Sequence, residues 1–554
     1  MVTKPDSNNS AQVEQYASWL PMIVIAMGQA LMSFNVAALP ISMGGMVQSF
    51  NTPPTTVGTA IVMYSLGVSA FIMLGGKLGQ RFGSKFFFQI AVSLFLVAMV
   101  LMVISPSATV MLAAQALAGL AGAALVPTLV ALIANHYRGQ QQAAALGWLG
   151  SARAMAGVLA FLIIGTLERF VSWRVAFSLL VVHAAAILLL SFKLKLAEKR
   201  PEVKIDGFGV LLIAIGIVTL IFGFNNVRGW GLLMARPNAP FTVFGLSPAP
   251  IMIVIGLVLV SAFLAWSNKR ESEGKTPLLA LEVMDSAKER ATVLAMFTIV
   301  GMESAVNFTV PLYIQIVQGR DAFQTAIAMM PFNLTVFFTA ILVVRIYNKF
   351  TPRQIASLAF ALVAASTLWL SFVVSNDWST FPVLLGLICF GIGQGALVTL
   401  LFNVLVTSSP KELSGDVGAL RGTANNLAAA VGTALIGALV VGVLSAGVMS
   451  SLTANPVIPT ELKQQVNLDN INFLSNNRLK ERLQSTTATP AQVAEAVRIN
   501  EEARLQALRI AFFVLSAFAL LAIFPSRLLP SYRPGEIPPV GKPVTSAAAP
   551  RRSS

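Results

Sequence analysis

The chain alternates long apolar stretches with short polar ones. A helix crosses the ~30 Å hydrocarbon layer of a bilayer with about 20 apolar residues, and about fourteen stretches reach that length. The pattern predicts an all-α membrane protein with about fourteen transmembrane helices. They begin near Trp19, Val57, Phe86, Val110, Ala143, Arg174, Gly207, Pro250, Ala291, Ala322, Gln354, Pro382, Val417 and Leu508.

Composition agrees with the bilayer as solvent. Hydrophobic residues make up 56% of the 554 residues and charged residues 11%, and the mean hydropathy is +0.76. A soluble chain has near 45–50% apolar and about 25% charged residues. The net charge of +15 comes from bases in short loops and not from a basic face, which argues against nucleic acid as a partner. The single cysteine, Cys389, excludes a disulfide framework and a cysteine-based metal cluster, and the sequence predicts no metal and no cofactor.

Lysine and arginine are concentrated in alternate loops. Three of the connections on the other side, Gly44 to Thr56, Ser105 to Thr109 and Ser375 to Phe381, contain neither residue. Because short cytoplasmic loops carry an excess of Lys and Arg, the basic side is predicted to be cytoplasmic, with both termini on it. We therefore expect a multi-pass protein of the plasma (inner) membrane.

Two internal matches indicate a duplication. The loop Gly76 to Lys85 resembles Val344 to Arg353, and Gly150 to Gly165 aligns without gaps on Gly422 to Gly437. Parallel repeats of this kind build many transporters. The predicted organisation is a six-helix bundle over residues 1–205, two inserted helices and a cytoplasmic linker over 206–289, a second six-helix bundle over 290–526 with a long outward loop at 445–506, and a disordered cytoplasmic tail over 527–554.

The motifs resemble those of the major facilitator superfamily, and within it the fourteen-span drug:proton antiporter family. Gly76 to Lys85, GKLGQRFGSK, is similar to the superfamily loop G-x-L-x-D-R-x-G-R-[KR]. Ala37 to Pro40, Ser172 to Arg174 and Pro311 to Gln315 are similar to motifs of the first, sixth and ninth spans. The resemblance implies a transporter that rocks two bundles about a central site. It also implies a small-molecule substrate, protons as the coupling ion and a monomer in the bilayer.

The sequence departs from the family pattern at four points. The first-span acid falls near Leu31, the loop Asp on Gln80, the fourth-span Arg on Gln115 and the fifth-span Gly-Pro on Ala160-Phe161. The last of these motifs is the one most closely associated with antiport.

The two similar loops are a candidate cytoplasmic gate. With Gln80 in place of Asp, a charged tie becomes a neutral hydrogen bond, which is roughly half as strong. We therefore expect a looser gate, and we expect Gln80→Asp to shift the protein toward the outward-facing state. The alternative is that the bases only fix topology. The candidate gate residues are Gly76, Gln80, Arg81, Gly83, Lys85, Asn348, Lys349 and Arg353.

Glu303 is the candidate proton-coupling residue, since it lies inside the ninth span. A carboxylate at bilayer depth costs about 2.5–3.5 kcal/mol on insertion scales, and intramembrane ionisable residues usually have a function. The alternative is a neutral Glu303 that is hydrogen-bonded to Asn307 or Ser304 and only packs.

Arg153, in the fifth span, must face a cavity or a partner. It could bind an anionic substrate, pair with Glu303, or hold a purely structural or snorkelling position. His183 could titrate near pH 6.5, or be a hydrogen-bonded core residue. Neutral amides on the apolar helices line a substrate path or bridge helices. The predicted substrate cavity is Arg153, Asn35, Asn307, Asn425, Asn426 and Gln315.

The function hypothesis is proton-coupled export of a small organic or amphipathic compound by alternating access. Two alternatives stay open: uptake or facilitated diffusion of a polar solute, and a non-transporting receptor or assembly partner derived from a transporter. No nucleophile and base constellation suggests an enzyme, and no G-x-x-x-x-G-K-[ST] motif suggests ATP binding.

Overall fold

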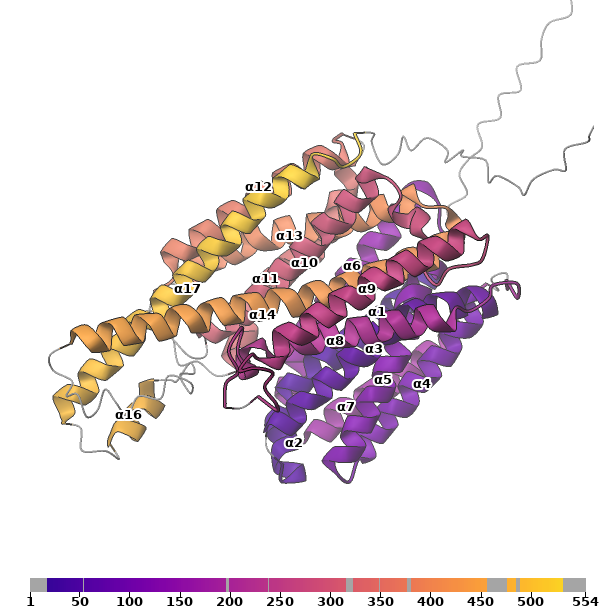
Figure 1. Ribbon diagram of the computed structural model, residues 1–554. Coiled ribbons are helices and arrows are strands. Elements are labelled where there is room, and N and C mark those ends of the chain that lie inside the picture. Colours follow the sequence, from indigo (N-terminus) through magenta and orange to yellow (C-terminus); the bar gives the residue numbers. More distant parts are fainter. Residues whose placement is uncertain are drawn as a thin grey trace, which may run out of the picture.

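Helices account for almost all of the backbone that the structure describes (Figure 1). The computed structural model describes residues 17–52, 54–195, 199–237, 239–314, 322–347, 349–375, 380–455, 476–484 and 489–531. Within these ranges, 14 helices are long and apolar enough to cross a membrane. The predicted all-α membrane fold is therefore confirmed, and the predicted helix starts agree with the structure to within a few residues, except for the last.

Six long helices form the N-terminal bundle. Helix α3 packs on α5, α5 on α4, α4 on α7, and α1 on both α6 and α7. A tight turn separates α3 from α4. At this turn Gly83 has a φ of +86°, which glycine adopts without strain. The helices are α1 (Leu20–Ile41), α3 (Pro54–Phe82), α4 (Ser84–Ile104), α5 (Ala108–His136), α6 (Gly139–Phe170) and α7 (Trp173–Ser191), with the short α2 (Met43–Phe50) between the first two.

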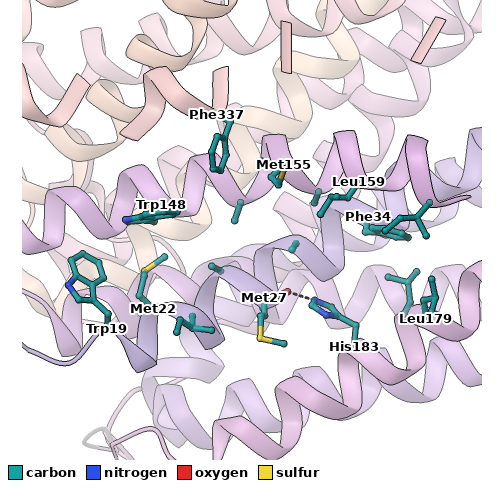
Figure 2. A pocket seen from close by; sticks show the side chains of 17 residues that line it. Trp19, Met22, Met27, Phe34, Trp148, Met155, Leu159, Leu179, His183 and Phe337 are labelled. Atoms are coloured by element: carbon teal, nitrogen blue, oxygen red, sulfur yellow. Dashed lines mark hydrogen bonds between the residues drawn. The ribbon is translucent and has the colours of Figure 1, made fainter. Parts of the chain in front are cut away.

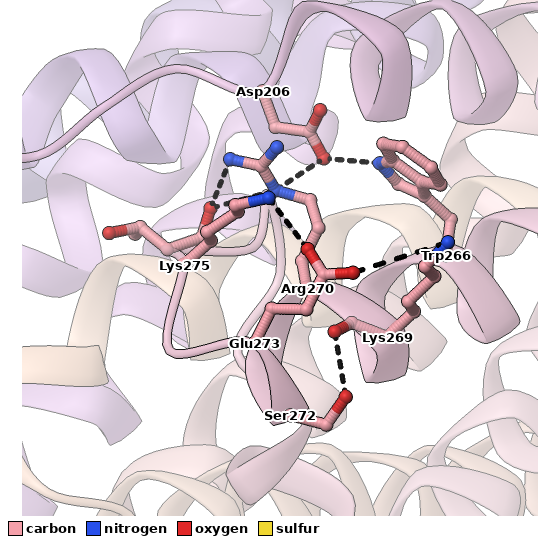
Figure 3. A network of polar contacts seen from close by, with 8 residues as sticks. Asp206, Trp266, Lys269, Arg270, Ser272, Glu273 and Lys275 are labelled. Atoms are coloured by element: carbon pink, nitrogen blue, oxygen red, sulfur yellow. Dashed lines mark hydrogen bonds and ion pairs between the residues drawn. The ribbon is translucent and has the colours of Figure 1, made fainter.

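Two further helices, α8 (Gly207–Trp230) and α9 (Pro248–Ser272), pack on each other, and α8 lies against α3 and α14. Asp206 starts α8 because its carboxylate accepts a hydrogen bond from the Gly209 amide at 3.1 Å. The same carboxylate accepts one from Trp266 Nε1 at 2.9 Å and pairs with Arg270 Nε at 3.4 Å (Figure 3). One buried acid therefore ties the beginning of α8 to the end of α9.

The remaining long helices form the C-terminal bundle. Helix α10 packs on α13 and α14, α11 on α13, and α12 on α13 and α17. Capping boxes at Ser286, Thr351 and Thr489 begin three of these helices. The helices are α10 (Ala287–Leu312), α11 (Ala322–Leu342), α12 (Pro352–Val373), α13 (Thr380–Ser408), α14 (Ser414–Ala454) and α17 (Pro490–Ser526), with the short η1 (Leu281–Met284), η3 (Val343–Ile346), η4 (Lys411–Leu413) and α16 (Asn476–Gln484).

The predicted outward loop at 445–506 is largely helical where the structure describes it. Helix α14 has 41 residues and α17 has 37, so at 1.5 Å per residue each is more than 50 Å long. Their ends project together from the bundle, with α16 beside α17 (Figure 1). Leu452 packs on Ile499, and Glu495 accepts a hydrogen bond from Asn455. The apolar run that begins near Leu508 is thus the second half of one helix, which corrects the predicted start.

The two bundles meet at one end, which we call the basic end: the end at which α3 gives way to α4 and α11 to α12. Helices of the two bundles approach each other closely there. A Cβ on Gly76 would lie 3.1 Å from the Gly415 carbonyl oxygen, and one on Gly147 would lie 2.8 Å from that of Ala340. Small residues let α3 approach α14 and α6 approach α11. In Figure 1 the projecting ends of α14 and α17 and the end of the N-terminal bundle near α2 diverge away from this closed end.

Cysteine labelling tests the orientation. Ser272 is the last residue of α9, and Thr242 precedes the first residue of this helix, so the two lie toward its opposite ends. Both residues are exposed, and Cys389→Ala removes the native thiol. With the basic end cytoplasmic, we expect Ser272→Cys to react with an impermeant maleimide only from the cytoplasmic side and Thr242→Cys only from outside. The reverse labelling pattern would overturn the orientation.

Candidate functional site

Glu303 lies between the two bundles. It is on α10, and its carboxylate accepts hydrogen bonds from Arg153 Nη2 on α6 at 3.1 Å and from Gln394 Nε2 on α13 at 2.7 Å. The side chains of Glu303 and Arg153 are 15% and 35% exposed. The structure thus places Arg153 against Glu303, one of the alternatives for this residue, and it gives the carboxylate partners other than Asn307 and Ser304.

This ion pair joins the bundles inside the membrane-spanning region. Protonation of the carboxylate would remove its charge–charge attraction to the guanidinium and leave only a hydrogen bond. Since Arg153 belongs to the N-terminal bundle and Glu303 to the C-terminal bundle, one proton can change the strength of the contact between them.

A second ion pair closes the basic end. Lys77 Nζ on α3 lies 2.9 Å from Asp416 Oδ2 on α14, and their side chains are 3% and 1% exposed. Gln80 Nε2 donates to the same oxygen at 3.3 Å. Sequence reasoning missed both members of this pair, although Asp416 is an acid that directly precedes a long apolar stretch and Lys77 is part of the repeated loop. The candidate gate residue Gln80 therefore adds a hydrogen bond to the Lys77–Asp416 ion pair.

The other candidate gate residues divide into two groups. Gly76 lies at the α3–α14 contact, and Gly83 forms the α3–α4 turn. Lys85 donates to the carbonyls of Phe192 and Leu194 within its own bundle. The exposed Arg81, Lys349 and Arg353 sit on the rim, and Asn348 lies outside the described residues.

This arrangement reverses the effect expected of Gln80→Asp. The new carboxylate would lie beside Asp416, and like charges at this distance repel. We now expect Gln80→Asp to weaken the closed basic end by about 1–2 kcal/mol, the loss of one hydrogen bond to a charged group plus repulsion. Double electron–electron resonance between labels on the rims of the two bundles should show longer distances, and shorter or unchanged distances would contradict the assignment. Gln80→Leu, which adds no charge, is the matched control.

The predicted amides that the structure describes have different surroundings. Asn35 is fully buried and exchanges hydrogen bonds with Gln115 at 3.0 and 3.3 Å, as the helix-bridging alternative predicts. Asn426 donates to the Gly422 carbonyl of its own helix. Asn307 is exposed, whereas Asn425 has a buried side-chain oxygen with no partner in the described structure. Gln315 lies outside the described residues.

An apolar cavity of about 810 Å³ lies along α6, the helix that carries Arg153 (Figure 2). Its size is within the 300–1,000 Å³ typical of small-molecule sites. Helices α1, α6 and α7 form the wall, together with Phe337 from α11. His183 is on this wall, where its Nε2 lies 3.0 Å from the Met27 carbonyl oxygen, so this nitrogen donates to it. On α6, Ala152 and Ala156 face the cavity on either side of Arg153 in sequence.

Comparison with known families places the chain. The family model of the Major Facilitator Superfamily matches residues 25–433, from the first span into α14. The chain belongs to this superfamily. It is accordingly a multi-pass transporter of the plasma membrane, and its transmembrane helices agree with that assignment.

Relatives of the superfamily share low identity with the chain over most of its length. The uncharacterized MFS-type transporter YfiU of Bacillus subtilis is 26% identical over 74% of the chain and 77% of its own length. The multidrug efflux pump LfrA of Mycolicibacterium smegmatis is 22% identical over 76% of the chain and 80% of its own length. The tetracenomycin C resistance and export protein of Streptomyces glaucescens is 24% identical over 76% of the chain and 75% of its own length.

Solved structures of the superfamily share the fold. The human organic anion transporter MFSD10 superposes with a TM-score of 0.57 at 14% identity and covers 92% of this chain and 99% of its own. The proton:xylose symporter XylE superposes with a TM-score of 0.56 at 11% identity and covers 91% of this chain and 94% of its own. In a major facilitator protein the two bundles move against each other, so the inter-bundle pairs Arg153–Glu303 and Lys77–Asp416 are placed where such motion breaks or forms contacts.

Proposed function

We propose that this chain exports a small organic or amphipathic compound in exchange for protons, and that Glu303 carries the coupling proton. The observation that supports this most directly is the position of its carboxylate, between Arg153 of one bundle and Gln394 of the other. The efflux pumps among its relatives favour export over uptake.

The proposed cycle follows from the closed basic end. In the conformation described here, Lys77–Asp416 holds α3 to α14 and Glu303 is paired with Arg153. A proton that reaches Glu303 from the outer side neutralises the carboxylate and weakens its hold on Arg153. The bundles then rock, the basic end opens, and the proton leaves to the cytoplasm while a compound binds. Re-formation of the two pairs returns the protein to the conformation described here and carries the compound outward.

The apolar cavity is the proposed place for the hydrocarbon part of such a compound. Its wall contains many apolar groups and a single titratable side chain, His183, which suits a ligand that is mainly apolar. Because α6 presents Ala152 and Ala156 to the cavity and Arg153 to Glu303, a bound molecule would lie next to the helix that carries the coupling pair.

Reconstitution tests the proposed function. Purified protein in liposomes should move at least one member of a panel of anionic, neutral and cationic fluorescent amphiphiles against its gradient when a pH difference is imposed. A protonophore should abolish that accumulation. Movement that is equal with and without the pH difference would indicate facilitated diffusion, and no movement of any compound would favour a non-transporting role.

A further inference from the structure

Arg421 is a buried cation that the proposed cycle does not use. It lies on α14 and is only 5% exposed. Among the described residues no acid pairs with it, and its guanidinium carbon lies 3.9 Å from the centre of the Phe402 ring on α13. A cation–π contact recovers only part of the cost of removing a guanidinium from water. The position therefore requires a further partner.

Unpartnered polar atoms lie close in sequence to both members of this contact, on α13 near Phe402 and on α14 near Arg421. Asn403, next to Phe402 on α13, is fully buried, and in the described structure neither of its amide atoms has a hydrogen-bond partner. The hydroxyl of Thr399, one turn earlier, and the side-chain oxygen of Asn425, one turn after Arg421, are likewise unpaired. More than nine in ten buried polar groups in proteins are satisfied, so several unpaired polar atoms on α13 and α14, beside a buried arginine that no described acid pairs with, indicate a ligand.

The local charge selects the ligand. Arg153 is close enough to repel Arg421 electrostatically, and the nearby carboxylate of Glu303 already accepts from Arg153 and Gln394. A cationic group would add to that repulsion. An acidic group would offset it, since the planar fork of a guanidinium matches a carboxylate, sulfonate or phosphate with two parallel hydrogen bonds.

We propose that Arg421 binds the acidic group of an amphipathic anion between the two bundles, with the Asn403 amide as a second donor. The inference deepens the proposed function and rests on it in taking this anion to be the transported compound. The aromatic face of Phe402, which already contacts Arg421, supplies an apolar surface beside the charge.

A matched pair of ligands tests the site. The full-length protein in phosphatidylcholine nanodiscs is titrated with 1-naphthaleneacetate and with 1-naphthaleneacetamide, which share the apolar ring and differ in charge; naphthalene sulfonate and naphthyl phosphate extend the series. We expect the wild type to prefer an anion of this series by about tenfold or more, the usual advantage of a hydrogen bond to a charged group. Arg421→Gln should remove that preference, while Arg421→Lys should keep part of it because the charge remains and the fork is lost.

The control and a second variant keep the result interpretable. Arg527 also lies over a phenylalanine ring, Phe524, at 5.8 Å, but it is exposed at the basic end, so Arg527→Gln should leave the preference unchanged. Asn403→Leu keeps the branched shape of the side chain but removes its hydrogen-bonding groups, and it should weaken anion binding several-fold. An anion preference that survives in both Arg421→Gln and Asn403→Leu, or no anion preference in the wild type, overturns the proposal. Repeating the titration in phosphatidylglycerol discs shows whether an anionic lipid competes and is itself the ligand.

The outcome is separable from that of the transport assay. Anion binding through Arg421 without any pH-driven movement leaves this site standing and removes the proposed export. If only neutral or cationic compounds move with the pH difference, and Arg421→Gln leaves binding unchanged, the proposed export stands and the Arg421 site is removed.

Discussion

Replacing Asp416 by asparagine should open the basic end. In the closed conformation Lys77 is buried against Asp416, so loss of the carboxylate leaves a buried, uncompensated ammonium. Breaking a buried ion pair in this way costs about 3–5 kcal/mol, which corresponds to a shift of roughly a hundredfold to several thousandfold in the balance of conformations. In the open conformation Lys77 reaches water and carries no such penalty, so the substitution acts mainly on the closed state.

Spin labels at Arg81 and Arg353 measure this shift, since both positions are exposed on the rim and belong to different bundles. In a Cys389→Ala background, Asp416→Asn should move the distance distribution to longer values. The double variant Lys77→Met with Asp416→Leu should recover much of the closed population, because replacing both charges by apolar groups removes the unpaired charge.

A matched control is provided by an exposed ion pair, Arg200–Glu412. Arg200 lies 3.7 Å from Glu412, and both side chains are largely in water, at 37% and 55% exposed. Exposed pairs contribute at most about 1 kcal/mol, so Glu412→Gln should barely change the distances. If Asp416→Asn and Glu412→Gln gave the same distribution, the buried pair would not hold the bundles together.

The helices could be predicted from the sequence because hydropathy is a local property. The Asp206 start of α8 and the Ser172 cap of α7 are encoded within a few residues of the helices they begin. The length of α17 was not predicted, since its first half lies outside the apolar run and carries Glu495, Arg498 and Glu502, which pair with one another along one face. Hydropathy alone assigns such a segment to a loop.

The site was only partly predictable, because its contacts depend on how the bundles dock. Lys77 and Asp416 are 339 residues apart, and nothing in either local sequence identifies the other as its partner. Glu303 and Arg153 could be selected as intramembrane charges, and their pairing was one of several alternatives. The amides could not be sorted, since Asn35 in a closed pair with Gln115 and Asn425 with an unpaired oxygen occur in equally apolar surroundings.

Replacing Glu303 by glutamine should abolish uphill transport while leaving exchange intact. The amide keeps the size of the side chain and an oxygen that can still accept from Arg153 or Gln394, but it has no proton to gain or release. One pH unit corresponds to about 1.4 kcal/mol per proton, so a single coupled proton supports up to about tenfold accumulation in the wild type. In Glu303→Gln the accumulation ratio should fall to about one, whereas counterflow between labelled and unlabelled compound continues.

Glu303→Asp distinguishes coupling from packing. The shorter acid can still be protonated, so transport should stay coupled with an altered pH optimum, since its burial and its distance to Arg153 change. A purely structural Glu303 predicts the opposite ranking, with glutamine tolerated and aspartate damaging through lost packing.

Glu502→Gln is the matched control for the coupling assay. It removes a carboxylate that also pairs with an arginine, Arg498, but on the projecting part of α17 and 60% exposed. It should accumulate compound as the wild type does. Equal pH-driven accumulation in wild type, Glu502→Gln and Glu303→Gln would show that Glu303 does not carry the proton. His183, on the wall of the apolar cavity, would then be the next titratable group to test, because it is the one ionisable side chain among the residues that line that cavity.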